Sequence, residues 1–302
     1  MYQIYYHSDD YGISPNSSKR ILELVREGHL DSISIIPNMH YYDECIDILK
    51  TEWRSLPIKP KISVHINLVD GIGVSSGWTS PMSWGQLFLK SFIHNNGYRA
   101  ARTLITDEIC EQIRRLYADI KDLPGVDGEL RLDSHQHTHI VPIVFDSMLD
   151  AIKLASDRDG VAYDSKLTYI RLSSEPFWMF MTTPGVVGTF PIINLVKNII
   201  LRVLGVSAHK KLTKRGIMHG MICGLNMSGC MDGKRMALLM PKLEAYAKKR
   251  DIYMEIFGHA GIVLPEEVSP EFGESHRIFY VDANRDVEYE GMKVVCNRLA
   301  GN

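Results

Sequence analysis

The alternation of short apolar runs with longer segments of helical periodicity is the feature that most constrains the fold of this chain. Strands that alternate with helices favour a parallel sheet, because each helix returns the chain to the same end of the sheet. We expect strands over residues 3–7, 32–36, 62–66, 130–135, 169–172, 217–222 and 252–257. We expect helices over residues 15–27, 42–50, 107–121, 142–156, 192–204 and 234–249. This many repeats of one unit favours an α/β fold of the TIM-like (β/α) barrel type.

No boundary in the sequence divides the chain into separate units. The chain has 302 residues and contains no Pro/Ser-rich linker and no internal repeat. Barrels of roughly 250 residues often fold as one unit, so the length suits a single barrel. We therefore predict one domain over residues 1–302, with an apolar insertion around residues 173–215.

Charge and cysteine content limit the class of partner and the compartment. The formal net charge is -2 at pH 7 and no basic stripe is present, so we expect no nucleic-acid partner. The five cysteines are odd in number and scattered, which is typical of free thiols in a reducing cytoplasm. No signal peptide precedes the first expected strand. We expect a cytoplasmic protein.

One long apolar segment complicates that expectation. Residues 177–196 contain no charged side chain, although prolines and glycines interrupt them too often for a membrane-spanning helix. An amphipathic helical pattern and then a basic run follow, over residues 192–204 and 209–215. We favour a buried helix and an apolar loop that covers the active site as a lid. The alternatives are a homodimer contact, or a contact with a membrane surface or a lipid-linked substrate through residues 177–204.

Three histidines on alternate residues suggest a metal or catalytic site. If His135, His137 and His139 lay on one strand, their imidazoles would share a face of the sheet. Imidazole is the commonest protein ligand for transition metals. The chain has 12 histidines, so the cluster by itself decides nothing and the other strand ends must be considered.

Other polar side chains follow the expected strands, where sites of parallel α/β folds assemble. Asp9 and Asp10 end the first strand, and two adjacent carboxylates repel each other unless a cation lies between them. They are equally consistent with capping of the next helix. His65 lies inside an apolar strand, where a core histidine is the simpler interpretation. His259 ends the last strand beside glycines, which let backbone approach a ligand closely.

An aspartate with two histidines is a common set of metal ligands that leaves positions open for water and substrate. Such a set fits a hydrolase and also a non-haem iron oxygenase. The additional carboxylate and histidine favour hydrolysis, which needs a base for water and an acid for the leaving group.

Four segments give a specific resemblance. They are Asp9-Asp10-Tyr11-Gly12, Ser63-Val-His65-Ile-Asn-Leu68, Asp133-Ser-His135-Gln-His137-Thr-His139 and, more loosely, Glu255-Ile-Phe-Gly-His259-Ala260. In order and spacing the sequence resembles the YdjC/ChbG family of carbohydrate deacetylases. The match covers about the first 160 residues well, and it is poor over about residues 166–216.

The resemblance implies a distorted (β/α) barrel and an enzyme that removes the N-acetyl group from an N-acetylated amino sugar or oligosaccharide. It implies one divalent metal ion, Mg²⁺ or Zn²⁺, bound by Asp10, His65 and His135. Asp9 would be the general base and His259 the general acid. The metal would polarise the acetyl carbonyl and lower the pKa of its bound water.

The remaining polar residues of these segments are expected to contact the substrate or to support the ligands. If the strand ends near Ser134, His135 alone of the three histidines needs to reach the metal. His137 and His139 then face the substrate or hold the ligands, and Asp133 supports the strand end. Arg171 would orient Asp9 or bind substrate, and a surface ion pair is an equal alternative for it.

Departures from the family pattern keep other functions open. Gly258-His259-Ala260 replaces the usual Cys-His-Pro, which weakens the assignment of the acid more than that of the metal ligands. A metal-dependent phosphoesterase is one alternative, although more arginines would be expected around a phosphate. A glycan-binding protein without catalytic activity is the other.

Overall fold

A seven-stranded parallel sheet forms the centre of the protein in a computed structural model that describes residues 2–92, 96–126, 128–272 and 274–296. The strands are β1 (Gln3–Tyr11), β2 (Ser32–Ile35), β3 (Lys61–Ile66), β4 (Leu130–Ser134), β5 (Leu167–Ile170), β6 (Met221–Cys223) and β7 (Tyr253–Gly258). Their spatial order is β5-β4-β3-β2-β1-β7-β6, and every pair is parallel. All carboxyl ends therefore lie at one edge, as the predicted alternation of strands and helices requires.

The sheet curls into a half-barrel, as a distorted TIM-like barrel would, but continuous strand pairing does not close it. The edge strands β5 and β6 share no ladder; an isolated bridge joins Tyr169 to Met218, ahead of β6. The predicted strand over residues 217–222 is reduced to the three residues of β6. A strand that short leaves too few backbone groups to complete a ladder with β5.

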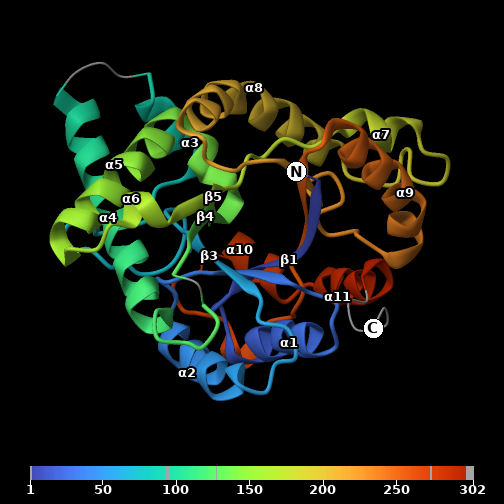
Figure 1. Cartoon of the computed structure of the whole chain (residues 1–302), viewed down its shortest axis with the longest axis horizontal. Helices are drawn as coiled ribbons and strands as arrows, with labels where there is room; N and C mark the ends of the chain where they lie inside the picture. The colour runs from blue at the N-terminus through green and yellow to red at the C-terminus, as the bar shows by residue number, and fades with distance from the viewer. Residues whose placement is uncertain (1, 93–95, 127, 273, 297–302) are drawn as a thin grey trace.

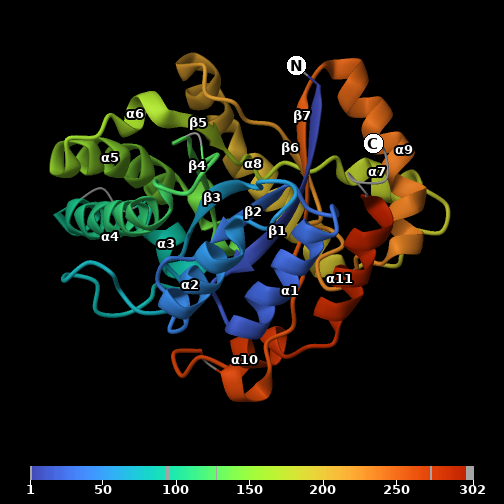
Figure 2. The same ribbon diagram turned by 60° about the horizontal axis from the view of Figure 1, so that its bottom comes forward.

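Helices lie around the outside of the sheet, as Figures 1 and 2 show. The longer ones are α1 (Pro15–Arg26), α2 (Tyr42–Trp53), α4 (Asn96–Ile120), α5 (Pro142–Asp159), α8 (Ile192–Arg215), α9 (Gly233–Arg250) and α11 (Asn284–Val295). The short ones are α3 (Trp84–Lys90), α6 (Tyr163–Lys166), α7 (Phe177–Thr182) and α10 (Glu274–Tyr280). The six predicted helices are present, but α4 begins earlier and α8 ends later than expected. The C-terminal helices α10 and α11 were not predicted.

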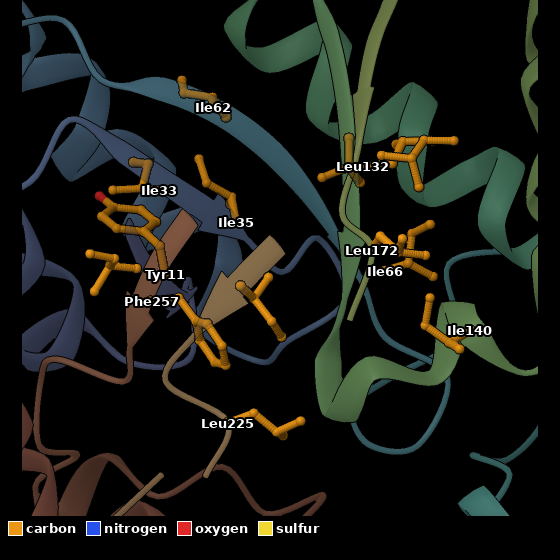
Figure 3. Packing of buried hydrophobic residues seen from close by; sticks show 14 of the residues in the cluster. Tyr11, Ile33, Ile35, Ile62, Ile66, Leu132, Ile140, Leu172, Leu225 and Phe257 are labelled. Atoms are coloured by element: carbon orange, nitrogen blue, oxygen red, sulfur yellow. The ribbon is translucent and has the colours of Figure 1, made fainter. Parts of the chain in front are cut away.

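Apolar side chains of the strands pack under these helices. Figure 3 shows part of this core, including Ile33 and Ile35 of β2, Leu132 of β4 and Phe257 of β7. All four are buried, as near-continuous apolar runs in a parallel sheet with covered faces must be. The core thus fixes the strands whose carboxyl ends carry the polar residues.

The histidine cluster is not on a strand. β4 ends at Ser134, and residues His135–Ile140 form a short 3-10 helix, η1, in which Gln136 and His137 have positive φ angles of 53° and 56°. The change of backbone direction separates the three imidazoles. The expectation that the strand ends near Ser134 is confirmed, and a shared face for the three histidines is wrong.

The helix of the apolar segment is largely exposed, so the expected buried helix is wrong. α7 is short, and α8 extends through the predicted basic run to Arg215. Within the described part of the chain, α8 is the one helix long and apolar enough to cross a membrane, but most of its surface is exposed. Its inner side packs against the protein, while isoleucines and valines of its outer side face solvent.

Candidate metal centre and catalytic groups

The candidate site lies at the carboxyl ends of the strands, against a cavity of about 560 Å³. β1 supplies Asp9, β3 supplies His65, and His259 follows β7. These three residues line the cavity together with His135 and His137 of η1. Segments that are far apart in sequence meet here because parallel strands end at a common edge.

Asp10, His65 and His135 form a compact set of buried donors. One donor atom from each residue lies within 4.8 Å of those of the other two. Asp10 Oδ1 is 3.6 Å from His65 Nε2 and 3.0 Å from His135 Nδ1. The structure therefore brings together the three side chains that the resemblance assigns to a metal. A carboxylate oxygen with two imidazole nitrogens suits a divalent ion of the Zn²⁺ or Mn²⁺ type. Mg²⁺ prefers oxygen ligands, so it would fit this site if fewer of the nitrogens bound it directly.

Asp133 fixes the orientation of His65. His65 Nδ1 donates a hydrogen bond to Asp133 Oδ1 at 2.7 Å, and both side chains are buried. That bond uses Nδ1 as the donor and directs Nε2 toward Asp10. A carboxylate behind a histidine in this way is the usual support of a metal-binding imidazole. Asp133, which we expected to support the strand end, thus holds the imidazole of His65.

Asp10 is held from its other side by an arginine. Its backbone has a φ of 70°, and Arg285 Nη2 donates to its Oδ2 at 2.6 Å, leaving Oδ1 toward the two histidines. Burial alone would raise the pKa of Asp10, but His135 and Arg285 hold it well below its usual range. Asp10 is therefore an ionised carboxylate that presents one oxygen to the site.

His135 lies between carboxylates and a phenol. Its Nδ1 faces Asp10, and its Nε2 lies 2.8 Å from the Tyr280 hydroxyl and 3.4 Å from Asp70 Oδ2. Burial opposes a charge on this imidazole, yet Asp10 and Asp70 raise its pKa to about 10. A proton on His135 and a metal ion held by this set would therefore compete for the same negative surroundings.

Asp9 is a buried carboxylate with both oxygens on one guanidinium. Arg171 Nη1 donates to Asp9 Oδ2 at 2.9 Å, and Nη2 donates to Oδ1 at 2.8 Å. Burial would raise the pKa of Asp9, but Arg171, followed by His65 and His7, holds it well below its usual range. Asp9 is therefore ionised and fixed in direction at the cavity wall.

Arg171 is not a surface residue, so the alternative of a surface ion pair is wrong. It is fully buried and binds Glu255 through Nε at 2.6 Å and Asp133 Oδ2 through Nη2 at 2.9 Å. It does not line the cavity, which places it behind Asp9 rather than against a substrate. His7, Asp9 and Asp133 form a second compact set, and the Arg171 guanidinium already binds both of its carboxylates.

The other two histidines of the cluster have different positions. His137 lines the cavity, and its Nδ1 lies 3.0 Å from the Ser173 hydroxyl. His139 is fully buried away from the cavity; its Nε2 donates to the Arg171 carbonyl at 2.8 Å, and its Nδ1 accepts from Ser134. Burial lowers the pKa of His139 to about 4, so it is a neutral support of the strand end. His137 alone of the two is placed to meet a substrate.

His259 faces the cavity with a carboxylate behind it. Its Nδ1 lies 3.2 Å from Glu288 Oε2, and its backbone N–H donates to the same oxygen at 2.6 Å. Burial lowers the pKa of His259, but Glu288 and the more distant Asp10 and Asp9 raise it further, so the net shift is upward. His259 is consequently a histidine that keeps its proton at higher pH than a free imidazole.

Several site residues were missed in the sequence. Tyr280, Arg285 and Glu288 come from α10 and α11, and Asp70 comes from the loop after β3. No strand end or motif marks them, because the contacts that bring them to the site are entirely tertiary. The spacing of apolar residues in residues 284–295, with a polar side opposite, was the one local signal for α11.

Comparison with known proteins gives one family. A family model described as YdjC-like protein matches residues 3–293. A comparison with curated proteins gives no match. A solved structure of a proposed cellobiose-phosphate cleavage protein from Enterococcus faecalis V583 aligns over 97% of this chain and 95% of that chain, with a TM-score of 0.49 and 12% identity.

Proposed function

The chain belongs to the YdjC-like family, and we propose that it is a metal-dependent hydrolase that removes the N-acetyl group from an N-acetylated amino sugar or oligosaccharide. The observation that supports this most is the arrangement of Asp9, His65 and His259 around one cavity. Asp9 would be the base, His65 one of the metal ligands and His259 the acid. Amide hydrolysis requires these groups to reach one space.

The metal would be held by Asp10, His65 and His135, for the reasons of geometry and burial given above. A divalent ion bound there supplies Lewis acidity toward the acetyl carbonyl and makes a bound water more acidic. Asp133 holds His65 through Nδ1, and Arg285 holds Asp10 through Oδ2, which leaves His65 Nε2 and Asp10 Oδ1 for the metal. Mg²⁺ and Zn²⁺ are the ions we propose.

Asp9 is the proposed base. It is ionised at neutral pH, lies at the cavity wall, and has its direction fixed by the two bonds from Arg171. A fixed carboxylate accepts a proton from an incoming water without first losing rotational freedom. His259 is the proposed acid, because its raised pKa keeps a proton available for the departing amine.

The lining of the cavity suits a sugar ring. Trp84, Phe257, Phe279 and Tyr280 present aromatic faces, against which the C–H groups of a pyranose can pack. The candidate site contributes polar groups that would fix the acetamido group, and Asn194, Lys197 and Ser228 add polar groups from α8 and the loop after β6. An N-acetylated sugar is the substrate class that we propose.

The test combines metal analysis with acetate release. Purified protein is analysed for bound metal, and acetate is measured over a panel of N-acetylated mono- and oligosaccharides with and without a chelator. Asp10→Ala is expected to lose metal and activity, whereas Asp9→Asn keeps metal and loses activity. Asp122→Asn, at a carboxylate 87% exposed on the surface, is the control that changes neither.

Two outcomes would overturn this proposal. Release of phosphate from phosphomonoesters with no acetate from any glycan would favour the phosphoesterase. Sugar binding that Asp9→Asn leaves intact, with no product from the metal-loaded wild-type protein on any glycan, would favour a binding protein.

A further inference from the structure

The outer face of α8 is an exposed apolar surface, which we define as Ile192, Ile193, Val196, Ile199, Ile200, Val203 and Val206. These positions recur at intervals of three and four residues, so they share one side of the helix over four turns. Residues of the opposite side are buried against the protein: Asn194, Asn198, Leu201, Gly205, Ala208 and Leu212. An apolar face of this size on the outside of a protein indicates an interaction surface.

The charged side chains of α8 itself all carry one sign. α8 contains no Asp or Glu, and its basic residues are Lys197, Arg202, Lys210, Lys211, Lys214 and Arg215. Lys211 pairs with Asp146, whereas Lys210, Lys214 and Arg215 are exposed in the last two turns. The helix therefore presents an apolar outer face in its first four turns and a cationic surface after it.

α8 cannot leave the protein to span a bilayer without breaking buried contacts. The Asn194 amide donates to the carbonyls of Asn226 and Ser228 at 3.1 Å each, and the Asn198 amide donates to Glu175 at 3.1 Å. These bonds hold the inner side of the helix to the loop after β6 and to Glu175, which precedes α7. A helix anchored on one side can bury its other side only by lying along a surface.

The preceding helix adds aromatic and apolar groups beside α8. Arg202 lies over the ring of Phe177 at 5.8 Å, which places α7 against α8. Trp178 and Met181 of α7 are both exposed. Tryptophan is typical of positions at the boundary between water and lipid, where its ring is apolar and its N–H stays hydrated.

We propose that the outer face of α8 docks on the surface of an anionic lipid bilayer. Its isoleucines and valines enter the acyl boundary, and Lys210, Lys214 and Arg215 bind the negatively charged headgroups. A second copy of the chain is a poorer occupant, because neither α8 has an acid to pair with the basic residues of the other. A membrane surface has anionic headgroups for the basic end of the helix and an apolar layer beneath them for its isoleucines and valines.

Docking by this face would bring the site to the membrane. Lys197 and Ile200 are exposed and also line the cavity, so the docking face reaches its edge. Substrates carried on a lipid would then be favoured over soluble ones. This last point rests on the proposed deacetylase, whereas the docking itself does not.

Vesicle flotation tests the docking without any substrate. Full-length protein is mixed with vesicles of phosphatidylcholine alone, or of phosphatidylcholine with about 30 mol % of the anionic lipid phosphatidylglycerol. Both kinds of vesicle are tested at low and at high salt. The wild-type protein is expected to float with the anionic vesicles and to be released by salt. Ile199→Glu/Val203→Glu abolishes flotation, and Lys210→Glu/Lys214→Glu lowers the bound fraction on the order of tenfold.

Matched variants keep the test specific. Val294→Glu on α11 changes an equally exposed apolar residue, and Lys248→Glu/Lys249→Glu on α9 reverses two exposed lysines of another helix. Both are expected to float like the wild type, and circular dichroism checks that every variant is folded. Absence of wild-type flotation on anionic vesicles would overturn the proposal. So would a solution dimer that Ile199→Glu/Val203→Glu converts to monomer.

Discussion

Arg171 and Asp9 form a two-bonded ion pair that is buried at the candidate site, with N–O distances of 2.8 and 2.9 Å. The same guanidinium also neutralises Asp133 and Glu255. Three buried carboxylates thus depend on one cation, so the geometry of the base and the stability of the fold are coupled through Arg171.

Arg171→Met is expected to lower the free energy of unfolding by about 3–5 kcal/mol, because it leaves carboxylates buried without a cation. Arg171→Lys keeps the charge but loses the paired geometry, so it should lose less stability and most of the activity. Urea denaturation measures the stability of both variants, and acetate release measures their activity. Arg115→Met, which removes the partner of the exposed Asp43, is the control and should cost less than about 1 kcal/mol. Equal costs for Arg171→Met and Arg115→Met would contradict the role of Arg171.

Asp133→Asn is expected to weaken metal binding by about 10–100-fold, because His65 loses the carboxylate that fixes its Nδ1 proton. Isothermal titration calorimetry with Zn²⁺ and Mn²⁺ gives the affinities. Asp150→Asn, at an exposed carboxylate paired with Arg102, should bind metal like the wild type. An Asp133→Asn affinity within twofold of the wild type would show that His65 needs no such support.

Glu288→Gln is expected to move the alkaline limb of the pH profile of kcat/KM to lower pH. The Glu288 carboxylate raises the pKa of His259, so removing its charge lowers that pKa and the proton is lost earlier as pH rises. Activity with an N-acetylated sugar is measured from about pH 5 upward past the usual histidine range, because the pKa of His259 is raised. An unmoved limb would assign the acid to another group.

Gly12→Ala is expected to destabilise the protein more than Gly160→Ala. Both glycines have positive φ, 102° and 65°, but a Cβ at Gly12 would lie 3.0 Å from the Ile36 carbonyl oxygen, whereas one at Gly160 meets nothing within 4 Å. Backbone strain alone costs roughly 1 kcal/mol, and the close approach adds to it only at Gly12. Thermal unfolding of both variants measures the difference, and equal losses would show that the chain yields at Ile36.

The order of strands and helices could be read from the sequence because each period is local. Apolar alternation and runs locate β1 to β5 and β7, and Ser14 with Pro15 marks the start of α1, where Ser14 accepts from the Ser17 backbone N–H. Closure could not be predicted, because it depends on the pairing of β5 with β6 across a long insertion. The resemblance located Asp10, His65 and His135, and the sheet then brought them together.

The sequence by itself determined the strands β1 to β5 and β7 and the helices α1, α2, α4, α5, α8 and α9, since the periodicity of a helix or a strand is set by neighbours in the chain. It also determined which residue types stand at the strand ends. Only the tertiary structure decided which of them share a space: that Arg171 is buried behind Asp9, that His139 turns away from the cavity, and that α11 brings Arg285 to Asp10. The physical reason is that burial, charge pairing and pKa depend on distances between residues more than 100 positions apart along the chain, as with the 275 positions between Asp10 and Arg285.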